Sequence, residues 1–128
     1  MGYHFSKRLD ASFDDAVART KAALAERGFG VLSEIDVAAT LKAKLNVDMP
    51  AYRILGACNP GFAHRALQAE PLIGTMLPCN VIVRAVGENA VEVSAVDPVA
   101  SMQAIENESL AATAGEVQAL LREAIESL

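Results

Sequence analysis

Two cysteines, each beside a proline and an asparagine, are the residues of this sequence best suited to chemistry. Cys58 precedes Asn59-Pro60, and Cys79 lies between Pro78 and Asn80. Asparagine followed by proline is typical of a helix N-cap and the first helical residue. The sequence therefore predicts Cys58 at the start of a helix, where unpaired N–H groups and the helix dipole would stabilise a thiolate.

These cysteines fit two kinds of reactive site. In the first, Cys58, Cys79 and His64 bind a metal ion such as Zn(II) or Cu(I), with one coordination position open. The sequence lacks the close C-x-x-C or H-x-x-x-H spacing common in metal sites. In the second, Cys58 is the attacking thiolate of a thiol-redox enzyme and Cys79 is the resolving cysteine. That chemistry requires the two sulfur atoms to come within bonding distance.

Two further interpretations involve no reactive thiol. The start of the predicted helix can form a pocket for a small molecule or an anion. Its candidate binding residues are Tyr52, Arg53, Asn59 and Asn80. Alternatively, the cysteines are buried and inert, and the neighbouring Asn and Pro residues only shape turns. The sequence leaves all four interpretations open.

Hydrophobic periodicity predicts the elements that position these residues. Ser12, Asp36 and Asn107 are expected to cap helices, and Gly87-Glu88-Asn89 is expected to form a hairpin turn. The hairpin requires at least one antiparallel strand pair, so we expect an α+β fold with a mixed sheet, in the order β-α-β-α-β-α-β-β-α. The predicted strands are 3–9, 29–35, 51–58, 80–86 and 90–96, and the predicted helices are 13–27, 37–45, 60–69 and a C-terminal helix after residue 107.

The segments around the two cysteines resemble a known family. Residues 52–60 read YRILGACNP, residues 70–74 read EPLIG and residues 77–83 read LPCNVIV. This combination resembles the bacterial and archaeal family called domain of unknown function 302, over essentially the whole chain. The resemblance implies a compact α+β fold that stands alone as a small protein and forms a dimer. It implies no particular reaction.

Composition limits the classes of partner. The chain has 128 residues, with 11 Lys and Arg against 16 Asp and Glu, giving a formal net charge of −5. This acidic balance argues against binding to a nucleic-acid backbone, which requires clustered basic residues. The longest uncharged stretch, residues 71–83, is shorter than the roughly 18 residues of a membrane span. The N-terminal residues also lack the apolar run of a secretory signal, so we expect a cytoplasmic protein with no membrane partner.

These observations together predict one domain, residues 1–128, that binds a metal ion or a small ligand near Cys58 and Cys79. A thiol-redox enzyme and a structural or regulatory dimeric module are the alternatives. A homodimer is expected to bury part of the sheet or the apolar stripe of the C-terminal helix. Glu34 and Asp36, on one face of a predicted strand, are a further candidate pair for acid–base chemistry, although Asp36 is better explained as a helix cap.

Overall fold

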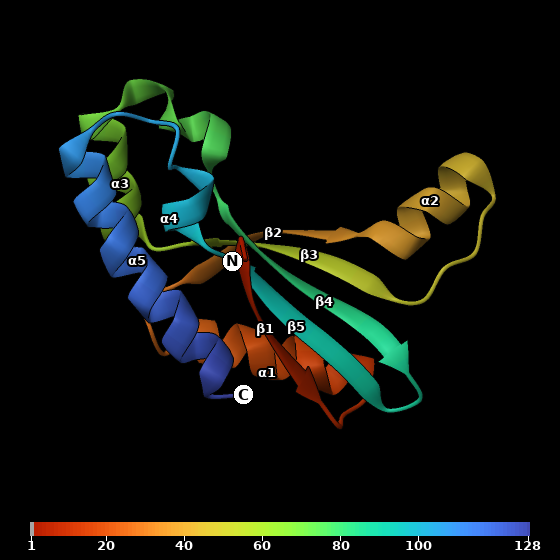
Figure 1. The fold of residues 1–128 in the computed structure, drawn as a ribbon. Helices are drawn as coiled ribbons and strands as arrows, with labels where there is room; N and C mark the ends of the chain where they lie inside the picture. The colour runs from red at the N-terminus through yellow and green to blue at the C-terminus, as the bar shows by residue number, and fades with distance from the viewer. Residues whose placement is uncertain (1) are drawn as a thin grey trace.

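The computed structural model describes residues 2–128, which form one five-stranded sheet and the helices packed around it (Figure 1). The strands are β1 (His4–Leu9), β2 (Gly30–Asp36), β3 (Tyr52–Cys58), β4 (Cys79–Gly87) and β5 (Ala90–Val96). The helices are α1 (Phe13–Ala25), α2 (Val37–Leu45), α3 (Pro60–Ala69), the 3₁₀ helix η1 (Pro71–Met76), α4 (Pro98–Ser101) and α5 (Glu108–Glu126). The predicted α+β class and the predicted order of the main elements are confirmed.

The sheet has the strand order β1-β5-β4-β3-β2, and each of these four pairings is antiparallel. The sheet is therefore entirely antiparallel, whereas a mixed sheet was the expectation. Parallel neighbours require a crossover that carries the chain back along the sheet. Here α2 lies beyond the end of β2, and β3 returns beside β2 in the opposite direction (Figure 1).

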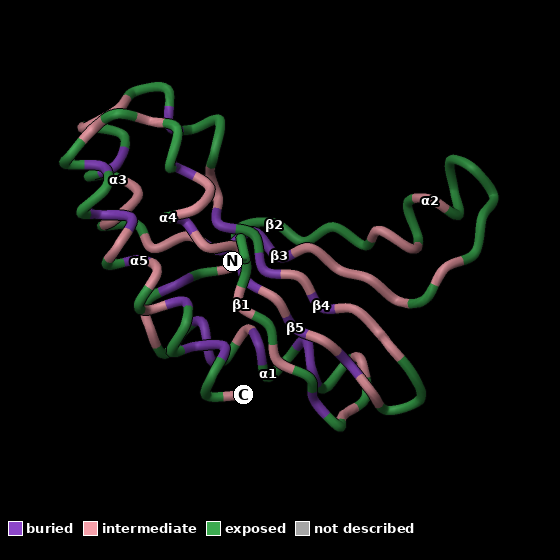
Figure 2. The backbone as a smooth tube through the Cα atoms, in the orientation of Figure 1, coloured by how far each residue is buried: buried purple, intermediate pink, exposed green. Residues whose placement is uncertain are grey.

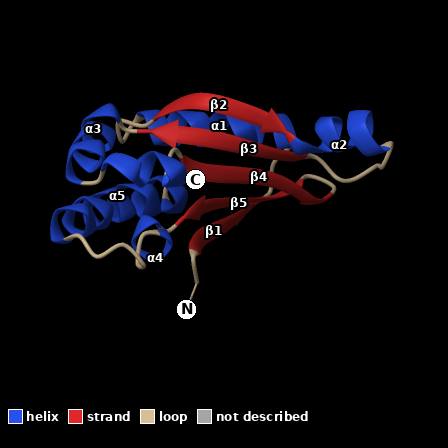
Figure 3. Ribbon diagram, turned by 90° about the horizontal axis from the view of Figure 1, so that it is seen from above, coloured by secondary structure: helices blue, strands red, loops and turns tan. Residues whose placement is uncertain are grey.

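Helices cover one face of the sheet and leave the other face open (Figure 3). Successive side chains of a strand point to opposite faces, and β5 accordingly alternates between buried and half-buried residues. The buried side chains of β3, β4 and β5 belong to one hydrophobic core with those of α1 and α5, and Figure 2 colours the buried positions of these elements purple. The fully buried side chains at this interface include Leu24, Leu55, Val81, Val83, Val91, Val93 and Leu121.

The C-terminal helix buries its apolar stripe inside this same chain. Leu110, Val117 and Leu121 are 1%, 8% and 0% exposed. The stripe therefore does not offer a free surface to a second copy, and that part of the dimer expectation is wrong. In contrast, α2 has no buried residue and makes its main contacts with β2 and β3, and it projects from the rest of the molecule (Figures 1 and 2).

Side-chain caps begin the helices where the sequence indicates. Ser12, Asp36, Asn59 and Asn107 each accept a hydrogen bond from a backbone N–H three residues ahead, at the start of α1, α2, α3 and α5. The short helix α4 is an unpredicted element, and Asp97 caps it. Within residues 2–128, no helix has both the length and the apolar character needed to cross a membrane.

Candidate functional site

Cys58 and Cys79 lie at the same end of neighbouring strands. Cys79 is the first residue of β4 and pairs with Ala57 of β3, and Cys58 is the last residue of β3. Asn59 and Pro60 follow directly and start α3, as the sequence predicts. Because the residue opposite Cys79 is Ala57 rather than Cys58, the two thiols are offset by one residue in the register. Both cysteines are free.

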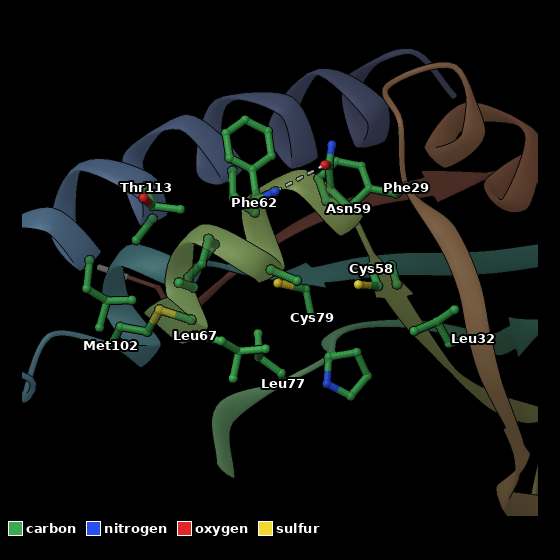
Figure 4. A pocket seen from close by; sticks show the side chains of 18 residues that line it. Phe29, Leu32, Cys58, Asn59, Phe62, Leu67, Leu77, Cys79, Met102 and Thr113 are labelled. Atoms are coloured by element: carbon green, nitrogen blue, oxygen red, sulfur yellow. Dashed lines mark hydrogen bonds between the residues drawn. The ribbon is translucent and has the colours of Figure 1, made fainter. Parts of the chain in front are cut away.

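A cavity of about 330 Å³ opens at this end of the sheet, and both cysteines line it (Figure 4). Its walls come from the ends of β2, β3 and β4 and from α3, α4 and α5. Phe29 and Leu110 are almost completely buried, whereas Leu32 and Leu67 are 72% and 42% exposed and lie at its opening. The other lining residues are Ala57, Asn59, Phe62, Ala63, Ala66, Leu77, Pro78, Pro98, Met102, Thr113, Ala114 and Val117.

No charged side chain is among these lining residues. The Thr113 hydroxyl and the carbonyl oxygen of the Asn59 side chain bond to their own helices. Asn59 accepts a hydrogen bond from the Phe62 N–H, and the Thr113 hydroxyl donates to the Ser109 carbonyl, at 3.4 and 3.1 Å. The cavity wall is therefore apolar apart from the two sulfur atoms and the amide N–H groups of Asn59.

Cys79 is held as a neutral thiol. Its exposed fraction is 8%, and burial raises the pKa of the Cys79 thiol to about 11, with a smaller contribution from the charge of Cys58. A thiol with this pKa is protonated at neutral pH and is a poor nucleophile and a poor metal ligand. The Cys79 side chain therefore contributes an uncharged, largely apolar surface to the cavity.

The structure does not bring His64 to the cysteines. His64 is exposed on α3 and lies outside the cavity lining. Among residues 2–128, no three His, Cys, Asp or Glu side chains are grouped so that they could hold a metal ion. The predicted ligand set of Cys58, Cys79 and His64 is therefore not assembled.

The other predicted binding residues separate onto two faces of the sheet. Asn59 reaches the cavity, but Arg53 lies on the helix-covered side, 5.2 Å from the centre of the Phe13 ring. Tyr52 and Asn80 are on the open face, where they line a separate depression. Tyr52 and Arg53 are neighbours on β3, and they lie on opposite faces of the sheet because successive side chains of a strand alternate between faces.

Glu34 and Asp36 form ion pairs rather than an acid–base site. Arg53 contacts Glu34 at 3.0 Å and Asp36 at 3.5 Å, and Lys21 contacts Glu34 at 2.7 Å. The hydrogen bond from Lys21, followed by smaller effects of Arg53, lowers the pKa of the Glu34 carboxyl. Asp36 also caps α2, as expected.

The cavity residues on α3 and α5 were not identified as site residues from the sequence. Phe62 and Ala66 come from α3, and Leu110, Ala114 and Val117 come from the apolar stripe of α5. The periodicity correctly predicts this stripe as buried. It carries no information on which of its residues face a void and which face the sheet.

Comparison with known proteins agrees with this fold. The family model described as "Domain of unknown function DUF302" matches residues 5–128. A comparison with curated proteins found no match. Among solved structures, the chain is similar to the crystal structure of an uncharacterised conserved DUF302 protein from Bacillus stearothermophilus, with a TM-score of 0.90, 24% sequence identity and 98% of each chain covered. The family model covers nearly the whole chain, and this protein therefore belongs to the DUF302 family.

Proposed function

We propose that this protein binds a small, uncharged, largely apolar molecule in the cavity beside Cys58 and Cys79. The observation that carries the proposal is a cavity of about 330 Å³ without a charged lining residue, at the end of the sheet. Ligand sites of proteins are concave and mostly apolar, with volumes of roughly 300–1,000 Å³. This cavity is at the lower end of that range.

The volume indicates the size of the ligand. An engineered apolar cavity of about 150 Å³ holds one benzene molecule. A cavity of about 330 Å³ is suited to a bicyclic aromatic compound or an aliphatic chain of similar size. Leu32 and Leu67 at the opening are exposed and supply an apolar path from the solvent.

The chemistry of the wall indicates a neutral ligand. A buried charge needs a partner of opposite charge or several hydrogen bonds. The lining has no charged side chain, and the Thr113 hydroxyl and the Asn59 carbonyl oxygen already bond to backbone groups. The pKa of Cys79 is about 11, so the amide N–H groups of Asn59 are the side-chain donors left for a ligand. The thiols and the aromatic ring of Phe62 instead favour polarisable, apolar ligands.

The metal and redox alternatives have less support. The described residues contain no group of three metal-ligating side chains, and the raised pKa of Cys79 disfavours thiolate chemistry at that residue. Rapid formation of a disulfide between Cys58 and Cys79 would favour the redox alternative.

Titration with 1-naphthol and with 1-naphthoate tests the proposal, because the two compounds share a ring system and differ in charge. We expect 1-naphthol to bind with a dissociation constant on the order of 10–100 µM and the anion to bind at least about tenfold more weakly. Ala63→Phe fills the cavity and should abolish 1-naphthol binding. The matched control is Ala111→Phe, at an exposed position of α5. Equal binding of both compounds, or unchanged binding to Ala63→Phe, would contradict the proposal.

We also infer that two copies of the chain associate through the projecting segment that contains α2. Leu45 and Val47 are 67% and 44% exposed there, and Ile35 of the preceding strand is 49% exposed. Exposed apolar residues gathered on one segment are typical of an interface between proteins. Leu45→Lys should shift sedimentation toward the monomer, whereas Leu72→Lys, at another exposed leucine, should not. A wild-type monomer at all concentrations would contradict this inference.

We further infer that residues 1–128 act as one domain in the cytoplasm. The structure joins the two cysteines by no disulfide, whereas small secreted domains are often rich in disulfides. Thiol counting on protein purified from its native cell without added reductant tests it. Two free thiols are expected, and an oxidised form would contradict a cytoplasmic location.

A further inference from the structure

The open face of the sheet carries a set of polar residues that neither the core nor the cavity uses. On β4, Val81 and Val83 point to the core, so Asn80, Ile82 and Arg84 point to the open face. The strand register places partners from β1, β3 and β5 around these three residues. They are His4, Ser6 and Arg8 of β1, Tyr52, Ile54 and Gly56 of β3, and Glu92, Ser94 and Val96 of β5.

This face differs in charge from the chain as a whole. The chain contains 16 acidic residues and has a net charge of −5. In the set just given, the only acidic residue is Glu92, and it lies between two arginines, Arg8 and Arg84. The open face therefore has a local positive charge that the overall composition does not indicate.

The arginines line one end of the face. The Arg84 guanidinium donates from Nε to Glu92 Oε1 at 2.9 Å, and its Nη2 is 2.7 Å from the same oxygen. The Arg8 Nε atom is 3.7 Å from Glu92 Oε2, and the Arg8 side chain is 72% exposed. Both arginines line a depression that also contains Ala85, Val86 and Gly87. Glu92 fixes Arg84 in place, and the more loosely held Arg8 is able to turn toward an anion.

A second depression, of about 400 Å³, adjoins the first at Arg84, which lines both. Its polar lining residues include His4, Asn80 and Tyr52. The His4 ring is fixed by a hydrogen bond of 2.8 Å between Nδ1 and Ser6 Oγ, and by an edge-on contact with the Tyr3 ring at 4.9 Å. Ser6 is in turn hydrogen-bonded to Ser94 at 2.7 Å. Within residues 2–128, the Asn80 amide makes no side-chain hydrogen bond, so its donor and its acceptor are free to bond to a ligand in the depression that Asn80 lines.

The two depressions together require a ligand with two different ends. The Asn80 amide lines the same depression as Tyr3, His4 and Tyr52. This combination suits a flat heterocycle, since asparagine pairs with the donor and acceptor edge of adenine and aromatic side chains stack on bases. Arg8 and Arg84 suit a phosphate. Asn80 and Arg84 are four residues apart on β4, which separates their Cα atoms by about 13 Å. This span matches a base at one end and a single phosphate at the other.

We propose that the open face of the sheet is a binding site for a nucleoside monophosphate. The base lies on Ile82 between Tyr3, His4 and Asn80, and the phosphate accepts hydrogen bonds from Arg8 and the free N–H groups of Arg84. A long nucleic acid does not fit this surface, because Arg8 and Arg84 are the two basic residues of the set and the rest of the chain has nine Lys and Arg against fifteen Asp and Glu. The site is separate from the apolar cavity, and it does not depend on ligand binding there.

Titration of the full chain with AMP, adenosine and inorganic phosphate tests this proposal. AMP is expected to bind most tightly, because only AMP reaches both ends of the site. Arg8→Ala should weaken AMP binding about tenfold, the effect of losing one charge-assisted contact, and should leave adenosine binding unchanged. Asn80→Leu should weaken both AMP and adenosine. Arg65→Ala is the matched control, because Arg65 is paired with Glu116 on the helical side of the molecule.

Three results would overturn the proposal. In the first, AMP does not bind to the wild type at millimolar concentration. In the second, AMP and inorganic phosphate bind with equal affinity. In the third, the AMP affinity is unchanged in both Arg8→Ala and Asn80→Leu. Near-ultraviolet circular dichroism of the variants verifies that each one is folded. Because 1-naphthol binding in the cavity should be the same in all of these variants, a failure here is distinguishable from a failure of the proposed function.

Discussion

Pro78 lies directly over the backbone of Gly56, so that a Cβ atom added to this glycine would be 2.7 Å from Pro78 Cγ. The same Cβ atom would also collide with the Ser33 hydroxyl. Ser33 of β2 and Pro78, which directly precedes β4, thus both lie against the backbone of β3 at Gly56. The contact joins the two cysteine-containing segments, GACNP and LPCN, which explains why a glycine precedes Ala57-Cys58 and a proline precedes Cys79.

Gly56→Ala should therefore destabilise the protein. Placing a methyl group in an already filled space costs about 1–3 kcal/mol, and urea denaturation measures the loss. Gly115→Ala is the matched control, because nothing lies within 4 Å of a Cβ at that position of α5. It should raise the free energy of unfolding by about 0.5–1 kcal/mol, the usual gain of alanine over glycine in a helix. A loss of equal size in both variants would contradict the close packing at Gly56.

The two cysteines should differ in reactivity. Cys58 is half-buried at the cavity, whereas Cys79 is buried and has a pKa of about 11. At neutral pH, a thiol-specific reagent should modify Cys58 at least about tenfold faster than Cys79, and Cys58→Ser should remove the fast phase. Addition of 1-naphthol should slow the modification of Cys58.

Mild oxidation with diamide provides the corresponding test of the redox alternative. We expect each thiol to be lost independently. Rapid formation of an intramolecular disulfide between Cys58 and Cys79 would contradict the ligand-binding account and favour a thiol-redox enzyme.

Ionisation of Cys79 should destabilise the fold at high pH. Its pKa is raised by burial from 9.0 to about 11, so the stabilisation is fully present below pH 9 and is lost as the pH rises through about 11. Two pKa units correspond to about 3 kcal/mol. The free energy of unfolding of the wild type should fall more steeply over this range than that of Cys79→Ala. The titration of lysines and tyrosines affects both proteins equally and cancels in the comparison. Cys58→Ala is the control, and parallel curves for wild type and Cys79→Ala would contradict the burial of this thiol.

The pKa of Glu34 should change by different amounts when Lys21 or Arg53 is removed. The pKa of Glu34 is lowered first by the hydrogen bond from Lys21 and then by Arg53. Lys21→Met should therefore raise this pKa toward 4.5 more than Arg53→Met does, as followed by carboxyl NMR titration. The stabilisation is present above pH 4.5 and is lost as the pH falls through the lowered pKa. Because these groups are partly exposed, each variant should cost no more than about 1 kcal/mol, and a larger shift in Arg53→Met would contradict this assignment.

Much of the fold follows from local signals in the sequence. Asn59-Pro60 and Asn107 mark helix starts, and the turn at residues 87–89 marks a hairpin, because capping and turn chemistry depend on neighbouring residues. The face of the sheet on which a strand residue lies depends on its exact position in the strand. Closeness in sequence groups Tyr52 with Arg53 in one site, but the two side chains lie on opposite faces. The cavity depends on how α3 and α5 pack at the sheet end. That packing is a tertiary property, and no local pattern around Phe62 or Leu110 encodes it.

A crystal structure with bound 4-bromo-1-naphthol tests the central claim most directly, since anomalous scattering locates the bromine atom independently of the rest of the ligand. We predict one strong bromine peak in the cavity, between α3 and α5 and in contact with Phe62 and Met102, both of which line the cavity. The peak should be absent in Ala63→Phe and retained in Ala111→Phe. A closed cavity without bromine in the wild type, or bromine bound only elsewhere on the molecule, would contradict the account.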